Sequence, residues 1–277
     1  MRQGRASKVF TYLILSCGVV LIFFPLYITV MTAFKTTAES TASYLRPASS
    51  FYLENFKTIL RGGDYWKALR NTVYVTAFVL LGNLAIMPML SYAVSRSMDS
   101  SRTYRYLYYY LLIGIFIPFQ VKMIPIVKLL SWMNMMTPSG LAILCIGSST
   151  CESVFLYVGY MESIPKEIEE AAYIDGASTS RTFFQIVFPL IKPILATAMI
   201  KDGLWIWNDY MLPLLTLNRT ADYWTLTLFS YNFRSTNVID YGTTFACYCL
   251  QMLPIMVFYV FMQKNIIGGL TQGAVKS

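Results

Sequence analysis

Three long stretches without a charged residue constrain the fold more than any other feature of the sequence. They cover residues 9–34, 71–95 and 241–263, and their lengths are 26, 25 and 23 residues. A helix needs about 20 apolar residues to cross a bilayer, so each stretch is long enough. The stretches are continuously apolar rather than alternating, which argues against a β-barrel. The sequence therefore predicts an all-α membrane protein.

The composition agrees with this prediction and excludes several classes of site. Only 13% of residues are charged, against roughly 25% in a soluble domain. The net charge of +8 fits basic residues that flank membrane spans, so we expect no nucleic-acid partner. The chain lacks histidine, the commonest general base, and its five cysteines lie in or beside apolar stretches without paired CxxC motifs. We therefore expect no catalytic residue, no metal site, no cofactor and no disulfide framework.

We predict six spans in one transmembrane domain, residues 1–277, with approximate bounds 9–34, 71–95, 106–128, 141–161, 194–217 and 241–263. Pro118 and Pro125 imply a kinked or broken helix in the third span. Residues 35–70 are polar and long enough for one or two short helices on the outer surface. Residues 133–140 read as an outer turn between the third and fourth spans.

The basic leader sets the expected orientation. Six spans place both termini on the same side, and Arg2, Arg5 and Lys8 favour the cytoplasm for that side. Over the whole chain, eleven Lys and Arg residues fall inside and ten outside, with Lys201 in the membrane. This balance adds little to the argument from the leader.

An acidic loop at residues 162–193, between the fourth and fifth spans, reads as two short helices bent at a glycine. Pro165 suits the first turn of the first helix, and Glu167, Glu169 and Glu170 complement the helix dipole there. The helix should end at Asp175 and Gly176, because glycine readily adopts the left-handed conformation.

The second helix of the loop is expected over residues 178–187. Phe183, Phe184 and Val187 would form its apolar side, and Pro189 would end it. Between two membrane spans, such an element is a candidate docking site for another protein.

The spacing within the loop resembles a known family pattern. Glu170, Ala171 and Ala172 are followed at fixed intervals by Gly176, and then by Ile186, Phe188 and Pro189. This is similar to the EAA loop of permease subunits of binding-protein-dependent ABC importers; only Phe188 departs, where leucine is usual. Five further stretches resemble carbohydrate-uptake permeases of the maltose and glycerol-phosphate type. They are IPFQV at 117–121, DGAS at 175–178, PLIKPIL at 189–195, WIWNDYMLPLL at 205–215 and GGLTQGAVKS at 268–277. The resemblance covers most of the chain from residue 71 and is weakest over 35–70.

The resemblance implies a type I ABC importer permease fold in the bacterial cell membrane, with six spans and a cytoplasmic coupling loop. It implies that this chain and a second homologous permease form a pore for sugar. Two cytoplasmic ATPase subunits would drive the pore, and an extracytoplasmic solute-binding protein would deliver the sugar. The ATPase contact would include Glu170, Ala171, Ala172, Asp175, Gly176, Ile186 and Pro189. The chain itself has no GxxxxGK[ST] loop, so ATP hydrolysis belongs to the partners.

Ionisable residues in the fifth span suggest a translocation pathway, because such residues are costly in a membrane. Asp202, Trp205 and Asp209 are spaced to share one helix face, with Asn208 beside them. Carboxylates, an amide and an aromatic ring suit the hydroxyls and apolar faces of a sugar, and Glu152 in the fourth span is a further candidate. In the alternative interpretation, Asp209 lies near the outer interface, Lys201 neutralises Asp202, and Glu152 pairs with a neighbour. The pair Lys201–Asp202 departs from the family, which is usually apolar there.

Three other functions are compatible with a polytopic membrane protein. A secondary transporter would show inverted repeats with broken helices in both halves, which we do not find. A membrane-embedded enzyme would need clustered acid–base groups, whereas the carboxylates here are scattered. The strongest alternative is an ABC importer permease for a solute other than a sugar.

Overall fold

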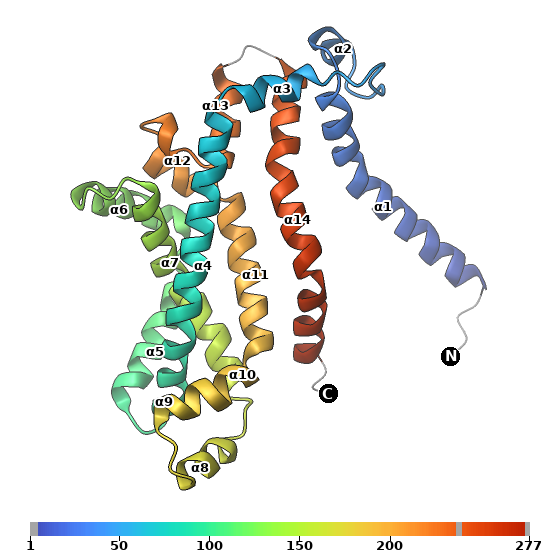
Figure 1. Ribbon diagram of the computed structural model, residues 1–277. Coiled ribbons are helices and arrows are strands. Elements are labelled where there is room, and N and C mark those ends of the chain that lie inside the picture. Colours follow the sequence, from blue (N-terminus) through green and yellow to red (C-terminus); the bar gives the residue numbers. More distant parts are fainter. Residues whose placement is uncertain (1–4, 237–239, 275–277) are drawn as a thin grey trace. The chain divides into compact units, whose positions relative to one another are not determined.

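The regular elements are all helices in the part of the chain that a computed structural model describes, residues 5–236 and 240–274 (Figure 1). Four of them are long and apolar enough to cross a membrane: α1 (Arg5–Ala33), α4 (Asp64–Ser97), α7 (Pro138–Met161) and α14 (Tyr241–Ala274). Two bent pairs pass the same test together, which gives up to six spans if each pair counts as one. The last residues of the predicted tail motif, 275–277, lie outside the described residues.

The first bent pair corresponds to the third predicted span. It joins α5 (Arg102–Ile115) to α6 (Phe119–Trp132) at an angle of 105°. Pro118 lies between them in an extended conformation; it has no backbone N–H to donate to α5, and it disfavours the helical conformation at the residue before it. The predicted break is therefore present, and Pro125 lies inside α6.

The fifth predicted span, 194–217, is not one continuous helix. It consists of α11 (Lys192–Asn208) and α12 (Met211–Leu217), separated where Asp209 is extended. The carboxylate of Asp209 accepts hydrogen bonds from the backbone N–H groups of Met211 at 3.0 Å and Leu212 at 3.4 Å. A side chain that caps the next helix in this way ends the previous one.

The chain divides into two compact units, of which the first comprises residues 1–66 and 229–254. It contains α1, the short helices α2 (Thr37–Ala42) and α3 (Glu54–Arg61), and parts of α13 (Leu226–Thr236) and α14. The buried amide of Asn55 donates to the carbonyls of Ala33 and Lys35, both at 2.8 Å, and its oxygen accepts from Thr243 at 3.3 Å. The expected short helices over 35–70 are therefore present, and α4 begins within that segment.

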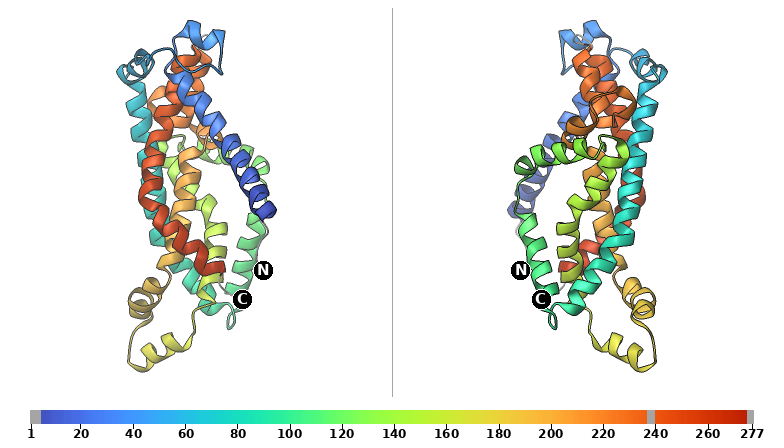
Figure 2. Two further views of the ribbon diagram at one scale, coloured as in Figure 1. Left: turned by 90° about the vertical axis from the view of Figure 1, so that its right-hand side faces the viewer. Right: turned by 90° about the vertical axis from the view of Figure 1, so that its left-hand side faces the viewer.

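The second unit comprises residues 67–228 and 255–277, and it holds the loop and the ionisable span. Its apolar core joins α4, α7 and α11 through residues such as Val79, Cys145 and Ile206. A second cluster includes Tyr157 of α7, Leu195 of α11 and Phe183 of the loop. The loop element α8 (Glu167–Ile174) projects beyond the ends of α4 and α7, and α9 (Thr179–Thr182) and α10 (Phe188–Leu190) lead from it back to α11 (Figures 1 and 2).

Candidate functional site

The first arm of the acidic loop, α8, ends as predicted. Gly176 has a positive φ of 82°, and its N–H donates to the carbonyl of Tyr173 at 3.0 Å. The N–H of Ala177 donates to the carbonyl of Ala172 at 2.9 Å, which completes a Schellman motif. No heavy atom lies within 4 Å of the position that a Cβ of Gly176 would occupy. Backbone conformation, and not lack of space, therefore requires glycine here. The start differs slightly from the prediction, because α8 begins at Glu167 and Pro165 precedes it.

The second arm of the loop contains an irregular turn that sequence patterns did not predict. Ser178 caps α9 by accepting from the N–H of Arg181, and a π-helical turn then runs from Phe183 to Val187. Pro189 lies inside α10 and does not end the helical segment; the bend of 73° follows Leu190.

The predicted apolar side of the second arm is also incomplete. Phe183 and Val187 are buried, whereas Phe184 is 56% exposed. The extra residue in a π-turn shifts the phase of the side chains, so the three residues do not share one face.

The carboxylate of Glu169 fixes α8 to the end of α4. Its Oε1 lies 2.6 Å from Nη2 and 2.8 Å from Nε of Arg96, and its Oε2 accepts from the hydroxyl of Tyr92 at 2.8 Å. Glu169 is 4% exposed. Sequence reasoning placed Glu169 in the first turn but missed these contacts. The available signal was its spacing of three from Ala172, which puts both residues on the buried face of α8.

The opposite face of the loop is open. The exposed residues include Glu170, Ala171, Asp175, Gly176 and Pro189 from the predicted ATPase contact. Ile186 is half-buried, and Ala172 is buried within the chain, so its side chain is not part of the open surface. Ile174, which the motif did not single out, is 86% exposed. Carboxylates, a small side chain and an uncovered isoleucine together form a surface suited to a protein partner.

The ionisable residues of α11 belong to a polar network that joins three helices. Asp202 is 2% exposed and accepts a hydrogen bond from Asn83 of α4 at 2.8 Å. The same amide nitrogen lies 3.0 Å from the hydroxyl of Ser149 on α7. Lys201 lies 3.2 Å from Asp202 and 2.8 Å from Glu152 of α7. The network therefore includes the two pairings given above as the alternative: Lys201 neutralises Asp202, and Glu152 pairs with a neighbour.

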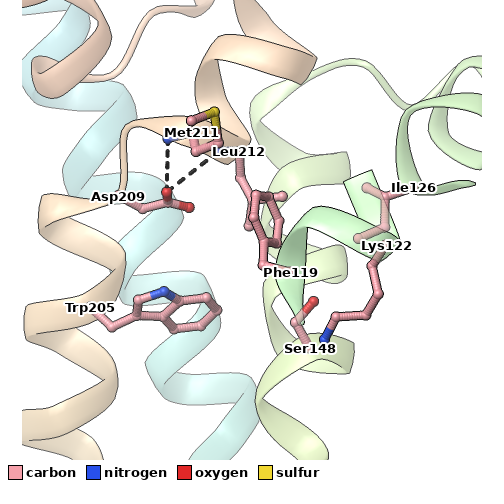
Figure 3. A pocket seen from close by; sticks show the side chains of 8 residues that line it. All are labelled: Phe119, Lys122, Ile126, Ser148, Trp205, Asp209, Met211 and Leu212. Atoms are coloured by element: carbon pink, nitrogen blue, oxygen red, sulfur yellow. Dashed lines mark hydrogen bonds between the residues drawn. The ribbon is translucent and has the colours of Figure 1, made fainter. Parts of the chain in front are cut away.

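Two adjacent pockets open beside this network. One, of about 270 Å³, is lined by Ser148, Ser149, Glu152, Lys201, Asp202 and Trp205. The other, of about 230 Å³, shares Ser148 and Trp205 and adds Asp209 together with Phe119, Lys122, Ile126, Met211 and Leu212 (Figure 3). The amine of Lys122 points toward Ser148 in Figure 3. An indole with carboxylates, hydroxyls and ammonium groups beside it can stack on and hydrogen-bond to a polyhydroxylated solute.

Two of the predicted pathway residues have local roles in the helix ends. Asp209 lines a pocket and also caps α12. Its Oδ1 therefore already accepts hydrogen bonds from two backbone N–H groups. Asn208 is exposed, and its amide donates to the carbonyl of Leu204 in the same helix at 2.8 Å. Lys122, which falls in the third predicted span, lines the pocket with Asp209. Among the described residues, no group of three or more His, Cys, Asp or Glu could hold a metal ion.

Residues 87–271 match a known family, described as the inner membrane component of binding-protein-dependent transport systems. The match spans the loop, both pockets and the network residues on α7 and α11, and it covers more than half of the chain. The chain belongs to this family. It is therefore a membrane-embedded permease, and its transport depends on a solute-binding protein.

Full-length relatives of this permease have names that agree with the family. The multiple sugar-binding transport system permease protein MsmG of Streptococcus mutans is 37% identical over 279 residues, covering 99% of both chains. The melibiose/raffinose/stachyose import permease protein MelC of Bacillus subtilis is 32% identical over 257 residues, covering 92% of this chain and 91% of the relative. These relatives are named as permeases, so the chain is a transport component and not an enzyme.

A solved structure shows the fold. A chain in the crystal structure of a bacterial ABC transporter involved in the import of the acidic polysaccharide alginate has a TM-score of 0.80. It is 20% identical, and the match covers 95% of this permease and 99% of that chain. The permease therefore has the ABC importer permease fold expected from the resemblance.

Proposed function

We propose that this permease forms half of the translocation pore of an ATP-driven importer of sugars or oligosaccharides. The full-length similarity to a sugar transport permease, 37% identical over 279 residues, is the observation that carries the proposal. The two pockets supply the chemistry, because Trp205 stands beside carboxylates, hydroxyls and ammonium groups along one side of α11. A solute other than a sugar is not favoured by the names of the relatives.

The loop between α7 and α11 would be the contact for the ATPase. Its open surface of Glu170, Ala171, Ile174, Asp175 and Gly176 would enter a complementary surface on one of two cytoplasmic ATPase subunits. ATP-driven closure of those subunits would move the loop. A second homologous permease would complete the pore, and a solute-binding protein would deliver sugar from outside.

Assignment of the pathway to Asp202, Trp205, Asp209 and Glu152 is also part of this proposal. Asp202 would act mainly by holding α4, α7 and α11 together, since it is almost fully buried. Trp205 and Glu152, which are 39% and half exposed, would contact the solute. Asn208 would lie beside the pathway, because its amide is engaged by its own helix.

Uptake by a deletion strain tests the function. Cells that regain this permease should take up at least one of radiolabelled melibiose, raffinose or stachyose, and should leave uptake of labelled glutamine unchanged. Stimulated uptake of glutamine alone would contradict the assignment to sugars.

Point variants in the same strain test the pathway. Asp209→Asn keeps an oxygen that caps α12 but removes the charge, so membrane abundance should stay normal while the apparent KM for sugar rises. Trp205→Ala should raise KM by roughly fivefold, because stacking on a ring contributes about 1 kcal/mol. Trp205→Phe, which retains a ring, is the matched control. Normal uptake by both Asp209→Asn and Trp205→Ala, at normal abundance, would remove these residues from the pathway.

A further inference from the structure

We propose that Glu169 is a positioning residue that joins the movement of the loop to α4. The proposal rests on the function proposed above, in which an ATPase moves the loop. It concerns the inner face of α8, whereas the ATPase contact concerns the outer face. The two faces are distinct because Glu169 and Ala172 are buried, while Glu170, Ala171 and Ile174 are exposed.

The contact between Glu169 and α4 is short and shielded from water. Three polar contacts of 2.6–2.8 Å link its two carboxylate oxygens to Arg96 and Tyr92. The side chains of Arg96 and Glu169 are 13% and 6% exposed. Removing one member of such a pair leaves the other charge buried and uncompensated, so the pair resists separation. A displacement of α8 therefore carries the end of α4 with it.

Tyr92 extends this contact to both arms of the loop. Its hydroxyl donates to Glu169 and lies 3.4 Å from the hydroxyl of Tyr173 in α8. Its ring lies 5.1 Å from the ring of Phe183, centre to centre, in the second arm. Tyr92 and Arg96 are four residues apart and share one face of α4, so a single helical turn holds the loop.

A second ionic contact between the loop region and the end of α4 is much weaker. Lys166 lies 3.1 Å from Asp99, but the two side chains are 55% and 71% exposed. Exposed pairs of this kind contribute little and are screened by salt. The mechanical link between loop and span is therefore assigned to Glu169 and not to Lys166.

The test uses the complete transporter in lipid nanodiscs, with ATP as the probe and hydrogen–deuterium exchange as the measurement. In the wild type, ATP should change exchange both in loop peptides covering 167–176 and in α4 peptides covering 90–97. In Glu169→Gln, the ATPase should still co-purify and the loop should still respond. The response of α4 should fall by about tenfold, a size typical of coupling between sites.

Two further variants separate coupling from simple loss of structure. Exchanging the charges, with Glu169→Arg and Arg96→Glu together, should restore the α4 response at least in part. Glu167→Gln removes an exposed carboxylate from the same helix turn and should respond as the wild type does. An α4 response that survives in Glu169→Gln would overturn the proposal, and so would a charge exchange that binds ATPase without restoring the response.

If the loop is not the ATPase contact, the experiment gives a result that differs from failure of the Glu169 proposal. A wild-type complex that does not retain the ATPase, or whose loop does not respond to ATP, would count against the proposed ATPase contact itself. If Glu169→Gln is poorly inserted, Glu169→Asp takes its place: a shorter carboxylate at normal abundance should weaken the α4 response, and an unchanged response would again overturn the proposal.

Discussion

Three buried polar side chains, Asn83 of α4, Ser149 of α7 and Asp202 of α11, meet one another across the helix interfaces. The amide of Asn83 shows this at the level of one residue, because its nitrogen lies within 3.0 Å of both Asp202 and Ser149, and its oxygen accepts from Ser149 at 3.1 Å. Without this donor, Oδ2 of the buried carboxylate of Asp202 would lose its hydrogen bond, although Lys201 would still lie 3.2 Å from Oδ1. Asn83 therefore stabilises the charge that the fifth span carries.

Replacing Asn83 with leucine should destabilise the permease. The loss of a hydrogen bond to a charged group costs about 1.5–3 kcal/mol, which lowers the melting temperature by about 3–12 °C for a chain of this size. Thermal unfolding in detergent measures the change. Asn208→Leu is the matched control, since Asn208 is exposed and bonds only its own helix; its melting temperature should stay the same or rise. Equal losses in the two variants would contradict the assigned role of Asn83.

Pairings between distant residues were the part of the site that could not be predicted. Glu169 and Arg96 are 73 positions apart, and Asn83 and Asp202 are 119 positions apart. Motif spacing identifies which residues share a helix face, but it does not say which helix lies against that face. The charges of Lys201, Asp202 and Glu152 were recognised from the sequence, and their mutual pairing was one of two alternatives.

At the level of elements, two helix ends could be predicted from the residue types that form them. The end of α8 at Gly176 and the cap of α9 at Ser178 depend on one or two residues each, so their residue types indicate them. The π-turn and the break at Asp209 were not predicted. The sequence around the π-turn reads as continuous helix, whereas the break has a local signal in Asp209, whose side chain accepts hydrogen bonds from the N–H groups that begin α12.

Alanine should have opposite effects on stability at Gly176, in the left-handed turn that ends α8, and at Gly159, inside α7. Gly176→Ala should cost about 1–2 kcal/mol, because any side chain strains a positive φ. Gly159→Ala in α7 has open space around its Cβ and should stabilise by up to about 1 kcal/mol. Limited proteolysis of the loop and thermal unfolding would show the contrast. A loop that is no more susceptible in Gly176→Ala than in Gly159→Ala would show that the turn does not depend on glycine.

At the scale of the whole molecule, the side of the membrane on which the loop lies remains a prediction. The basic leader favours the cytoplasm for both termini and for the loop. In permease that lacks the five native cysteines and is expressed without its ATPase, Ile174→Cys should react with an impermeant maleimide only in inside-out vesicles. Ser50→Cys, in the predicted outer segment, should react only in intact spheroplasts or right-side-out vesicles. The reverse pattern would invert the topology, and with it the proposed ATPase contact.

The overall class and family could be predicted from the sequence more completely than the site. Continuous apolar stretches set the membrane class, and the spacing from Glu170 to Pro189 indicated the family to which residues 87–271 belong. The number of spans could be predicted less directly from the sequence than the family. Two of the six depend on bent pairs: prolines indicated the break in the first pair, but no local pattern gave the angles of 105° and 73°.

The helix α1 makes the fold sensitive to the thickness of the surrounding bilayer. The most apolar stretch of α1 is not buried by the unit to which α1 belongs, so the bilayer is one of its possible surroundings. Its 24-residue candidate span, Phe10–Ala33, extends for about 36 Å, whereas the hydrocarbon core of a bilayer measures about 30 Å. A helix of this length fits by tilting or by locally thickening the membrane. Acyl-chain length is therefore a variable that can alter the behaviour of this permease without any change in its sequence.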